Sequence, residues 1–348
     1  MTNGMRLSNP TRNFLLLFVS LAAALLAGEF YLRWNPPASV YFETLETVQR
    51  THSEISPYPY IGHVPERGSV KTFRTSEFHT TIKINSMSMR DDEYPVQKPV
   101  GVKRIAVMGD SFVFGWGVEN KDVFTKLMEK EHLKNTDVLN FGVAGYSSYQ
   151  AFERLKRDAL KFQPDIVLFF LYGFPDGYPD TPVLYEIRDG HLVLADMPPP
   201  SFKKRVSRFL SKNIYWVALI NEARGTIQVG HPPPQEPSAQ KLETEKGLRL
   251  LKALKDFGTQ NHFIPVVFYI PIKQSVKEGT EPEAELVSRF CLQEGIYFLD
   301  LTRPLHDFWK RERKSPYFRI DNHWNLNGHR AVAGIVSQYL KEKGFLDQ

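Results

Sequence analysis

Short apolar segments alternate with amphipathic segments over most of the chain, from residue 103 onward. Apolar runs predict five strands, at residues 104–108, 138–141, 165–171, 264–270 and 296–299. The segments between them have apolar side chains at helical spacing and predict helices at 123–133, 149–162, 281–294 and 328–341. Strands that alternate with helices in this way form a parallel sheet with helices on both faces. The pattern therefore predicts an α/β protein built on a five-stranded parallel sheet.

A different pattern marks the amino terminus. Arg6 and Arg12 precede an apolar run over residues 14–28, and Glu29 and an aromatic edge follow it. This order is typical of a secretory signal or of a single membrane anchor. The run reaches the roughly 20 residues that a membrane span requires only if Glu29 lies at the interface. We favour an uncleaved anchor over residues 1–34, ahead of a cleaved signal and of a buried core helix.

The leading arginines orient such an anchor, because positive charge stays on the cytoplasmic side of a membrane. We expect the amino terminus inside the cell and the rest of the chain on the extracytoplasmic side, periplasmic or extracellular. The prediction is a single-pass protein of the cell membrane, in which the amino-terminal helix binds the bilayer.

Two regions depart from the alternation of strands and helices. Residues 35–100 contain helix-breaking prolines and one alternating stretch, 78–84, that predicts a strand. We expect a small β lead-in there, in front of a main domain over residues 101–348. Within this domain, residues 172–240 form an insertion after the third predicted strand. Open α/β sheets bind ligands at the carboxyl ends of their strands, so the insertion begins at the edge where a site is expected.

The insertion has its own pattern. Asp189-Gly190 predicts a hairpin turn, residues 202–222 predict a helix, and residues 230–237 form a proline-rich loop. The helix holds a basic cluster without an acidic residue: Lys203, Lys204, Arg205, Arg208 and Lys212. The whole chain has 44 Lys and Arg against 39 Asp and Glu, a net charge of +5, so this cluster equals the entire surplus. We expect either a solvated face or a surface for a membrane or an anionic substrate.

Composition excludes several classes of protein. Hydrophobic residues at 42% and charged residues at 24% are ordinary globular values, and they exclude a disordered chain and a multi-span membrane protein. The single cysteine, Cys291, excludes an intrachain disulfide and a cysteine-based zinc site. The sequence has no phosphate-binding glycine loop, no metal-ligand spacing and no basic and aromatic platform for nucleic acid. We expect no cofactor, no metal and no nucleic-acid partner.

Three short segments at the carboxyl ends of predicted elements carry candidate chemistry. Gly109-Asp110-Ser111 follows the first strand on a tight turn, where a serine hydroxyl can act as a nucleophile if a base lies near it. Asn140–Gly145 follows the second strand, and its glycines let backbone N–H groups approach a reacting oxygen. Asp321 and His323 precede the last helix, at a spacing that lets the carboxylate hold the imidazole ring. Taken singly, each segment also fits an ordinary turn or helix cap.

Together these segments resemble the characteristic blocks of the SGNH/GDSL hydrolase superfamily, over residues 100–345. The resemblance implies a flavodoxin-like three-layer fold and the activity of an esterase, lipase, deacetylase or O-acetyltransferase. It implies that Ser111 is the nucleophile, His323 the base and Asp321 its orienting partner. It also implies that the backbone N–H groups of Ser111 and Gly145 form part of an oxyanion hole.

Further side chains near these segments are candidates for contact with substrate: Asp110, Asn140, Asp176 and Trp324, with Arg90 as another that lines the site.

The sequence departs from the family at its third block. The family has Gly-x-Asn-Asp there, with the asparagine amide as a third oxyanion donor, whereas this chain has Gly173-Phe174-Pro175-Asp176. Proline offers neither a side-chain amide nor a backbone N–H. The loss of one donor costs on the order of a hundredfold in rate. Three outcomes stay open: catalysis with two N–H donors, a substitute donor from the insertion, or a binding function. The Asp-x-His spacing is also one residue shorter than usual and is similar to that of the polysaccharide O-acetyltransferase branch.

The leading hypothesis is a membrane-anchored serine esterase that acts on O-acyl esters of cell-envelope carbohydrate through an acyl-enzyme. An O-acetyltransferase of an exopolysaccharide or cell-wall glycan would use the same three residues, because the two reactions differ only in the acceptor. A catalytically weakened envelope protein that binds glycan or a partner is the alternative from another class. The expected partners are an acylated carbohydrate or lipid substrate, the membrane and, for acyl transfer, a membrane-bound acyl donor protein.

Overall fold

The computed structural model describes residues 9–34, 53–55, 63–75, 77–174, 185–188, 191–194, 206, 210, 214–223 and 237–346. The chain divides into two units. The larger unit spans Gln49–Met197 and Pro234–Gln348, and the smaller unit spans Met1–Val48 and Pro198–Pro233.

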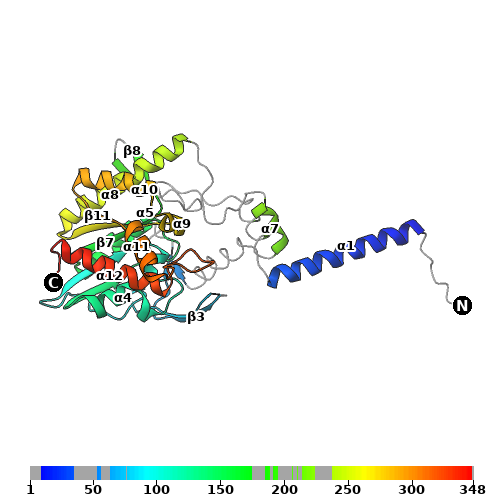
Figure 1. Cartoon of the computed structure of the whole chain (residues 1–348), viewed down its shortest axis with the longest axis horizontal. Coiled ribbons are helices and arrows are strands. Elements are labelled where there is room, and N and C mark those ends of the chain that lie inside the picture. Colours follow the sequence, from blue (N-terminus) through cyan, green and yellow to red (C-terminus); the bar gives the residue numbers. More distant parts are fainter. Residues whose placement is uncertain are drawn as a thin grey trace. The chain divides into compact units, whose positions relative to one another are not determined.

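A five-stranded parallel sheet forms the centre of the larger unit (Figure 1). Its strands are β5 (Lys103–Met108), β6 (Thr136–Asn140), β7 (Ile166–Tyr172), β10 (Ile264–Ile270) and β11 (Tyr297–Asp300). They lie in the order β11-β10-β7-β5-β6, and each neighbouring pair is parallel. Numbered along the chain, this is the order 2-1-3-4-5 of flavodoxin-like folds. The predicted flavodoxin-like sheet is confirmed, and each strand begins and ends within two residues of its predicted apolar run.

The sheet lies between two layers of helices. Side chains that alternate along β7 belong to two different buried clusters. Ile166, Leu168 and Phe170 belong to the first cluster, and Val167, Phe169 and Leu171 belong to the second. The first cluster takes in side chains of α4, α11 and α12, and the second takes in side chains of α5, α8 and α10. The central strands are therefore buried on both faces, which explains why their sequences are continuously apolar. Figure 1 shows α8 and α10 on one side of the sheet and α4 and α12 on the other.

The helices agree in part with the sequence pattern. The first layer contains α4 (Phe124–Leu127), a π-helical turn (Met128–His132), α11 (Thr302–Glu312) and α12 (Leu326–Glu342). The second contains α5 (Ser148–Arg157), the 3₁₀ turn Ala159–Phe162, α8 (Pro237–Asn261) and α10 (Pro282–Glu294). Short elements complete the set: α3 (Ser111–Phe114), the 3₁₀ turn Asn120–Asp122 and α9 (Lys273–Glu278). The four helices predicted around the sheet are present, although two of them end in π or 3₁₀ turns, whereas the pattern does not predict α8 and α11.

The lead-in forms two small antiparallel pairs. β1 (Ser53–Ile55) pairs with β2 (His63–Pro65), and β3 (Val70–Arg74) pairs with β4 (His79–Lys83). The predicted strand at 78–84 is β4. The hairpin of β3 and β4 packs on the main domain through Phe73 and Phe78, whose ring centroids lie 5.4 and 5.8 Å from that of Trp116. The expected small β lead-in is thus confirmed.

The insertion is described only in part. β8 (Tyr185–Arg188) and β9 (His191–Leu194) pair antiparallel on either side of Asp189-Gly190, which confirms the predicted hairpin. The predicted helix at 202–222 overlaps α7 (Tyr215–Ala223). The proline-rich loop before residue 237 and the basic cluster of residues 203–212 lie outside the described residues.

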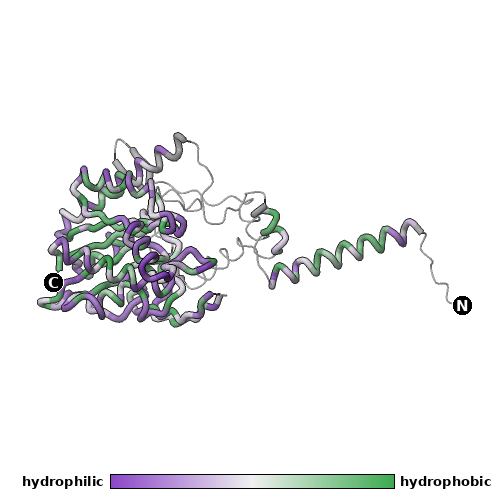
Figure 2. Tube along the Cα trace, viewed as in Figure 1, coloured by the Kyte–Doolittle hydropathy of each residue, from purple (hydrophilic) through white to green (hydrophobic). Residues whose placement is uncertain are grey.

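In the smaller unit, α1 (Asn9–Trp34) contains the apolar run of the amino terminus. Among the described residues, one segment is long and apolar enough to cross a membrane, Arg12–Trp34, with a mean hydropathy of 2.1. Figure 2 shows hydrophobic positions along most of this helix. Its length and composition agree with the predicted anchor.

Glu29, which interrupts the apolar run, caps α7. Its carboxylate accepts hydrogen bonds from the backbone N–H groups of Tyr215 at 3.2 Å and Trp216 at 3.3 Å, at the start of that helix. The Trp216 indole N–H donates to the carbonyl oxygen of Leu25 at 2.9 Å, and its ring covers Gly28. The first N–H groups of a helix lack intrahelical acceptors and carry partial positive charge. The one acidic residue of the run therefore stabilises the contact between α1 and α7.

Candidate active site

Ser111 is the first residue of α3, directly after β5 and its Gly109-Asp110 turn. The Asp110 carboxylate caps this short helix by accepting the N–H of Phe112 at 2.9 Å. Gly109 has no room for a side chain, because a Cβ there would lie 2.5 Å from a methyl group of Val113. The turn therefore fixes Ser111 at the carboxyl end of the sheet. Among the described residues, the Ser111 N–H has no hydrogen-bond acceptor.

Ser111, His323 and Asp321 form a continuous hydrogen-bonded chain. The Ser111 Oγ lies 2.6 Å from His323 Nε2, and His323 Nδ1 lies 2.5 Å from Asp321 Oδ1. The same carboxylate oxygen accepts the backbone N–H of His323 at 2.8 Å. In this order the carboxylate holds the Nδ1–H tautomer and leaves Nε2 free to take the serine proton. The fold thus brings Ser111 and His323, which lie 212 positions apart in the sequence, into hydrogen-bond contact.

The environment of His323 favours its protonated form. Burial of the ring lowers the pKa of His323, but the adjacent Asp321 carboxylate raises it, and the net pKa lies above the ordinary value. Asp321 itself has no exposed surface, so its charge acts on the ring without screening by water. This is the electrostatic setting that a base needs if it is to accept a proton from a hydroxyl and hold it.

The loop that carries Asp321 is held by two side chains that sequence reasoning missed. The Glu77 carboxylate, from the lead-in, accepts the backbone N–H groups of Arg319, Ile320 and Asp321 at 2.8, 2.9 and 2.6 Å. On the other side, the Lys273 ammonium donates to the carbonyl oxygens of Phe318 and Arg319 at 2.7 and 2.8 Å. Neither residue belongs to a recognisable motif, because each acts on backbone that is remote in sequence.

Trp324 is buried in the protein interior and is not part of the surface that a substrate can reach. It has no exposed surface, and its ring centroid lies 4.9 Å from that of Phe112 and 5.9 Å from that of His329. His329 Nδ1 accepts the N–H of Phe124 at 3.3 Å, and burial lowers the pKa of His329 to about 3. The prediction that Trp324 binds substrate is therefore wrong for this structure, in which the buried indole packs on Phe112, whose ring lies 4.8 Å from that of His323.

Asn140 also stabilises the fold and does not face the site. It is completely buried; its amide donates to the carbonyl oxygen of Val113 at 2.8 Å and its Oδ1 accepts the N–H of Gly142 at 2.9 Å. These bonds tie the turn after β6 to the end of α3, and they leave no side-chain surface for substrate. The prediction that Asn140 contacts substrate is likewise wrong, since the residue shapes the turn instead.

Gly145 lies in the same turn with φ at +79°, a conformation that residues with a side chain rarely adopt. Its N–H has no acceptor among the described residues. The backbone N–H groups of Ser111 and Gly145 are thus the candidate oxyanion donors, as the resemblance implies.

The remaining candidates have different fates. Arg90 is 1% exposed and its guanidinium bonds the carbonyl oxygens of Phe114, Gly115 and Val118, so it braces the turn behind Ser111 and does not line the site. After β7, Gly173 has φ at +71° and the Phe174 N–H donates to Glu283 at 3.2 Å.

Pro175 and Asp176 lie outside the described residues, so the expected loss of the third oxyanion donor and the role of Asp176 stay predictions. Asp110 is 6% exposed and lines a small pocket beside Ser111, together with Tyr146, Ser147 and Tyr172 and with the apolar Phe170 and Leu171. Among the described residues, no group of three or more His, Cys, Asp or Glu side chains is arranged to hold a metal ion.

No family model and no curated protein matches the chain. Several solved structures are similar to it. A putative lipolytic protein of the G-D-S-L family from Desulfitobacterium hafniense DCB-2 has 16% sequence identity, with 68% of this chain and 99% of that chain covered, at a TM-score of 0.41. The acetyl xylan esterase AlAXEase has 12% identity over 69% of this chain and 98% of its own, at a TM-score of 0.40.

The psychrotrophic esterase EstA from Pseudoalteromonas sp. has 11% identity over 70% of this chain and 99% of its own, at a TM-score of 0.42. Each of these three structures is of a protein described as lipolytic or as an esterase. The similarities are distant, and the chemistry of the site rests on its own geometry. The fold and the site define a flavodoxin-like α/β protein with a hydrogen-bonded Ser-His-Asp triad at the carboxyl end of its sheet.

Proposed function

We propose that this protein is a serine esterase with Ser111 as its nucleophile. The observation that supports the proposal is the hydrogen-bonded chain from the Ser111 hydroxyl through His323 to the buried carboxylate of Asp321. A serine hydroxyl is a weak nucleophile by itself, and a base within hydrogen-bond reach is what activates it.

The reaction follows from these positions. As Ser111 Oγ forms a bond to the acyl carbon of the ester, His323 Nε2 takes the hydroxyl proton. The negative charge that develops on the carbonyl oxygen is stabilised by the N–H groups of Ser111 and Gly145. The carbon–oxygen bond to the alcohol then breaks, and His323 returns the proton to the leaving oxygen. Water, activated by His323 in the same way, cleaves the acyl-enzyme and restores the free serine.

The acceptor decides between hydrolysis and transfer, since a sugar hydroxyl in place of water would give an O-acylated product through the same acyl-enzyme. The apolar segment Arg12–Trp34 supports a membrane anchor, and the leading Arg12 supports an extracytoplasmic position for the triad. An enzyme held there meets the carbohydrates and lipids of the cell envelope, so we include an O-acylated envelope molecule as the substrate in the proposal.

The test uses the full-length protein in detergent. We expect a fluorophosphonate probe to label the wild type, and hydrolysis of p-nitrophenyl acetate to fall by at least a thousandfold in Ser111→Ala, because the acyl-enzyme can no longer form. Ser337→Ala is the matched control: Ser337 is buried in α12 and its hydroxyl has no hydrogen-bond partner among the described residues, so labelling and rate should persist. Labelling that survives Ser111→Ala, or a wild type without labelling or hydrolysis, would overturn the proposal.

A further inference from the structure

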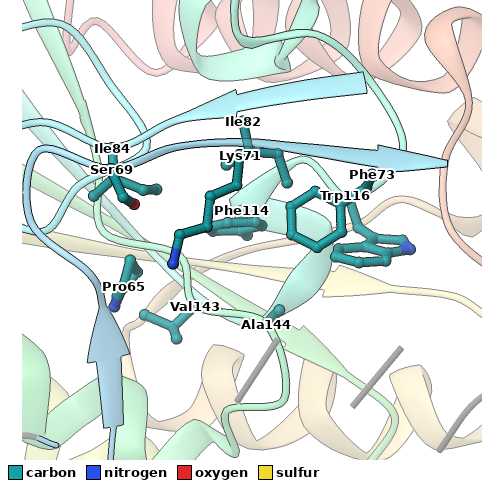
Figure 3. Close-up of a pocket in the computed structure, with 10 residues that line it drawn as sticks. All are labelled: Pro65, Ser69, Lys71, Phe73, Ile82, Ile84, Phe114, Trp116, Val143 and Ala144. Atoms are coloured by element: carbon teal, nitrogen blue, oxygen red, sulfur yellow. The ribbon is translucent and has the colours of Figure 1, made fainter. Parts of the chain in front are cut away.

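An apolar pocket lies between the lead-in hairpin and the turns that carry the candidate oxyanion donors (Figure 3). Phe73 of β3 and Ile82 of β4 form one wall, Phe114 and Trp116 form the second, and Val143 and Ala144 form the third. The enclosed free volume is about 30 Å³. One water needs about 10–15 Å³ on this measure, so the pocket has room for about two small groups such as methylenes.

The apolar side chains of the pocket walls favour a hydrocarbon ligand over a polar one. Each of those six side chains is at least nine-tenths buried. Lys71, which also borders the pocket, pairs its ammonium group with the Glu66 carboxylate. A sugar placed there would lose the hydrogen bonds of its hydroxyl groups to water without replacing them, whereas a hydrocarbon chain loses nothing.

The pocket adjoins the triad through backbone and ring contacts. Ala144 immediately precedes Gly145, one of the two candidate oxyanion donors. The Trp116 N–H donates to the carbonyl oxygen of Ser111 at 3.0 Å, and the Trp116 ring centroid lies 6.5 Å from that of His323. A group bound in the pocket is therefore flanked by the same two turns that would hold the ester carbonyl.

The second depression, beside Ser111, has a mixed lining. Asp110, Tyr146, Ser147 and Tyr172 supply polar groups there, next to Phe170 and Leu171. An ester has an acyl part and an alcohol part. In an acylated polyol the acyl part is apolar and the alcohol part is polar, and the two depressions differ in polarity in the same sense.

We propose that the apolar pocket binds the acyl chain of the substrate, and that this chain is short but longer than acetyl, with about two methylene groups. The proposal rests on the esterase function proposed above and adds the substrate class. The hairpin of β3 and β4 then determines specificity, because it supplies the outer wall. Each methylene group that leaves water for such a pocket is worth up to about fourfold in kcat/KM.

The test is a series of p-nitrophenyl esters with acyl chains of two, four, six and eight carbons, hydrolysed by the full-length protein. We expect kcat/KM to rise by roughly tenfold or more from the two-carbon ester to the optimum. In Ile82→Trp, which fills the pocket from β4, the ratio of the optimal ester to acetate should fall by roughly the same factor. The matched control is Val70→Trp on the neighbouring strand: Val70 is 61% exposed, so the chain-length profile should stay that of the wild type.

The outcomes separate this proposal from the esterase function. A wild type that hydrolyses acetate best, or a profile that Ile82→Trp leaves unchanged while the serine probe still labels the variant, overturns the acyl-chain proposal and leaves the esterase function standing. A wild type that hydrolyses none of the esters and takes up no probe overturns both.

Discussion

The carboxylate of Glu77 accepts the backbone N–H of Asp321 at 2.6 Å, although the two residues are separated by 244 positions. The same carboxylate accepts the N–H groups of the two preceding residues. Glu77 lies in the lead-in, between β3 and β4, and Asp321 orients the proposed base. The lead-in therefore contributes to the site in two ways, as a wall of the apolar pocket and as the support of the loop that carries the triad carboxylate.

Removal of this support should lower the rate of the chemical step. In Glu77→Ala three backbone N–H groups lose a charged acceptor, and the loop no longer fixes Asp321 against His323. We expect kcat to fall by about 10- to 100-fold with KM little changed, because misplacement of a catalytic group weakens the transition state and not the binding of the ester. Steady-state kinetics of the full-length protein measure both constants.

Two further variants show whether Glu77 acts by position. Glu77→Gln retains one acceptor oxygen and should recover part of the lost kcat. Glu119→Ala is the control, because its carboxylate accepts one backbone N–H of the same hairpin, that of Thr81 at 3.0 Å, without contact to the 319–321 loop. If Glu119→Ala and Glu77→Ala lower kcat equally, Glu77 has only a structural role in the hairpin.

Substitution of Asp321 should change both the rate and its pH dependence. In the wild type, kcat/KM rises as pH rises through the pKa of His323, since the base must be neutral, and this pKa lies above the ordinary value. In Asp321→Asn the carboxylate that raises it is absent, so the rising limb should move to lower pH. The rate should fall by about 10³- to 10⁴-fold, because the amide no longer holds the required tautomer.

A pH–rate profile of Asp321→Asn beside Asp307→Asn checks this prediction. Asp307 forms a surface ion pair with Arg303 on α11 and serves as a charge-matched control. A profile whose limb does not move in Asp321→Asn would show that the carboxylate does not set the pKa of the base.

His329 should make the protein less stable in acid. Its pKa in the folded state is lowered to about 3, by burial first and by the charge of Arg90 second, whereas an unfolded histidine titrates near 6.5. The folded-state pKa is the lower one, so between about pH 6.5 and 3 the unfolded chain binds a proton that the folded chain does not. Stability is therefore lost as pH falls through that window, by up to about 1.4 kcal/mol per pH unit.

His329→Gln removes this titration while an amide oxygen can still accept the N–H of Phe124. We expect the free energy of unfolding to fall less between pH 7 and pH 4 in the variant, by about 2 kcal/mol, in urea titrations followed by circular dichroism. His323 contributes with the opposite sign in both proteins, so the difference isolates His329. Exposed His79 is the control: His79→Gln should lose as much stability in acid as the wild type.

The sheet could be predicted from the sequence because β7 and β10 are buried on both faces and leave continuous apolar runs. The triad candidates could be predicted because each stands beside a strand end or a helix start, where local spacing shows them. The sequence pattern does not predict α11, because Pro304 stands at its third position and proline usually indicates a break, although proline is tolerated in the first turn of a helix.

Other parts of the site leave no local signal. Glu77 is an isolated acid whose hydrogen-bond donors lie more than 240 positions away, and only the packing of the lead-in on the main domain brings them together. Asn140 and Trp324 stand next to proposed catalytic segments, and proximity in sequence suggests contact with substrate. Their side chains instead point into the interior, a choice of face that the sequence does not reveal.

The contact between α1 and α7 predicts the effect of a larger side chain at Gly28. A Cβ at that position would lie 2.2 Å from the Trp216 ring, so Gly28→Leu must displace the ring and with it the hydrogen bonds from the start of α7 to Glu29. We expect the backbone amides of α7 to exchange hydrogen roughly tenfold faster or more in the detergent-solubilised protein, since a helix end without its cap opens more readily. Ala24→Leu introduces the same side chain at an exposed position of α1 and should leave the exchange unchanged. Equal protection of α7 in Gly28→Leu and the wild type would show that the two helices do not depend on this contact.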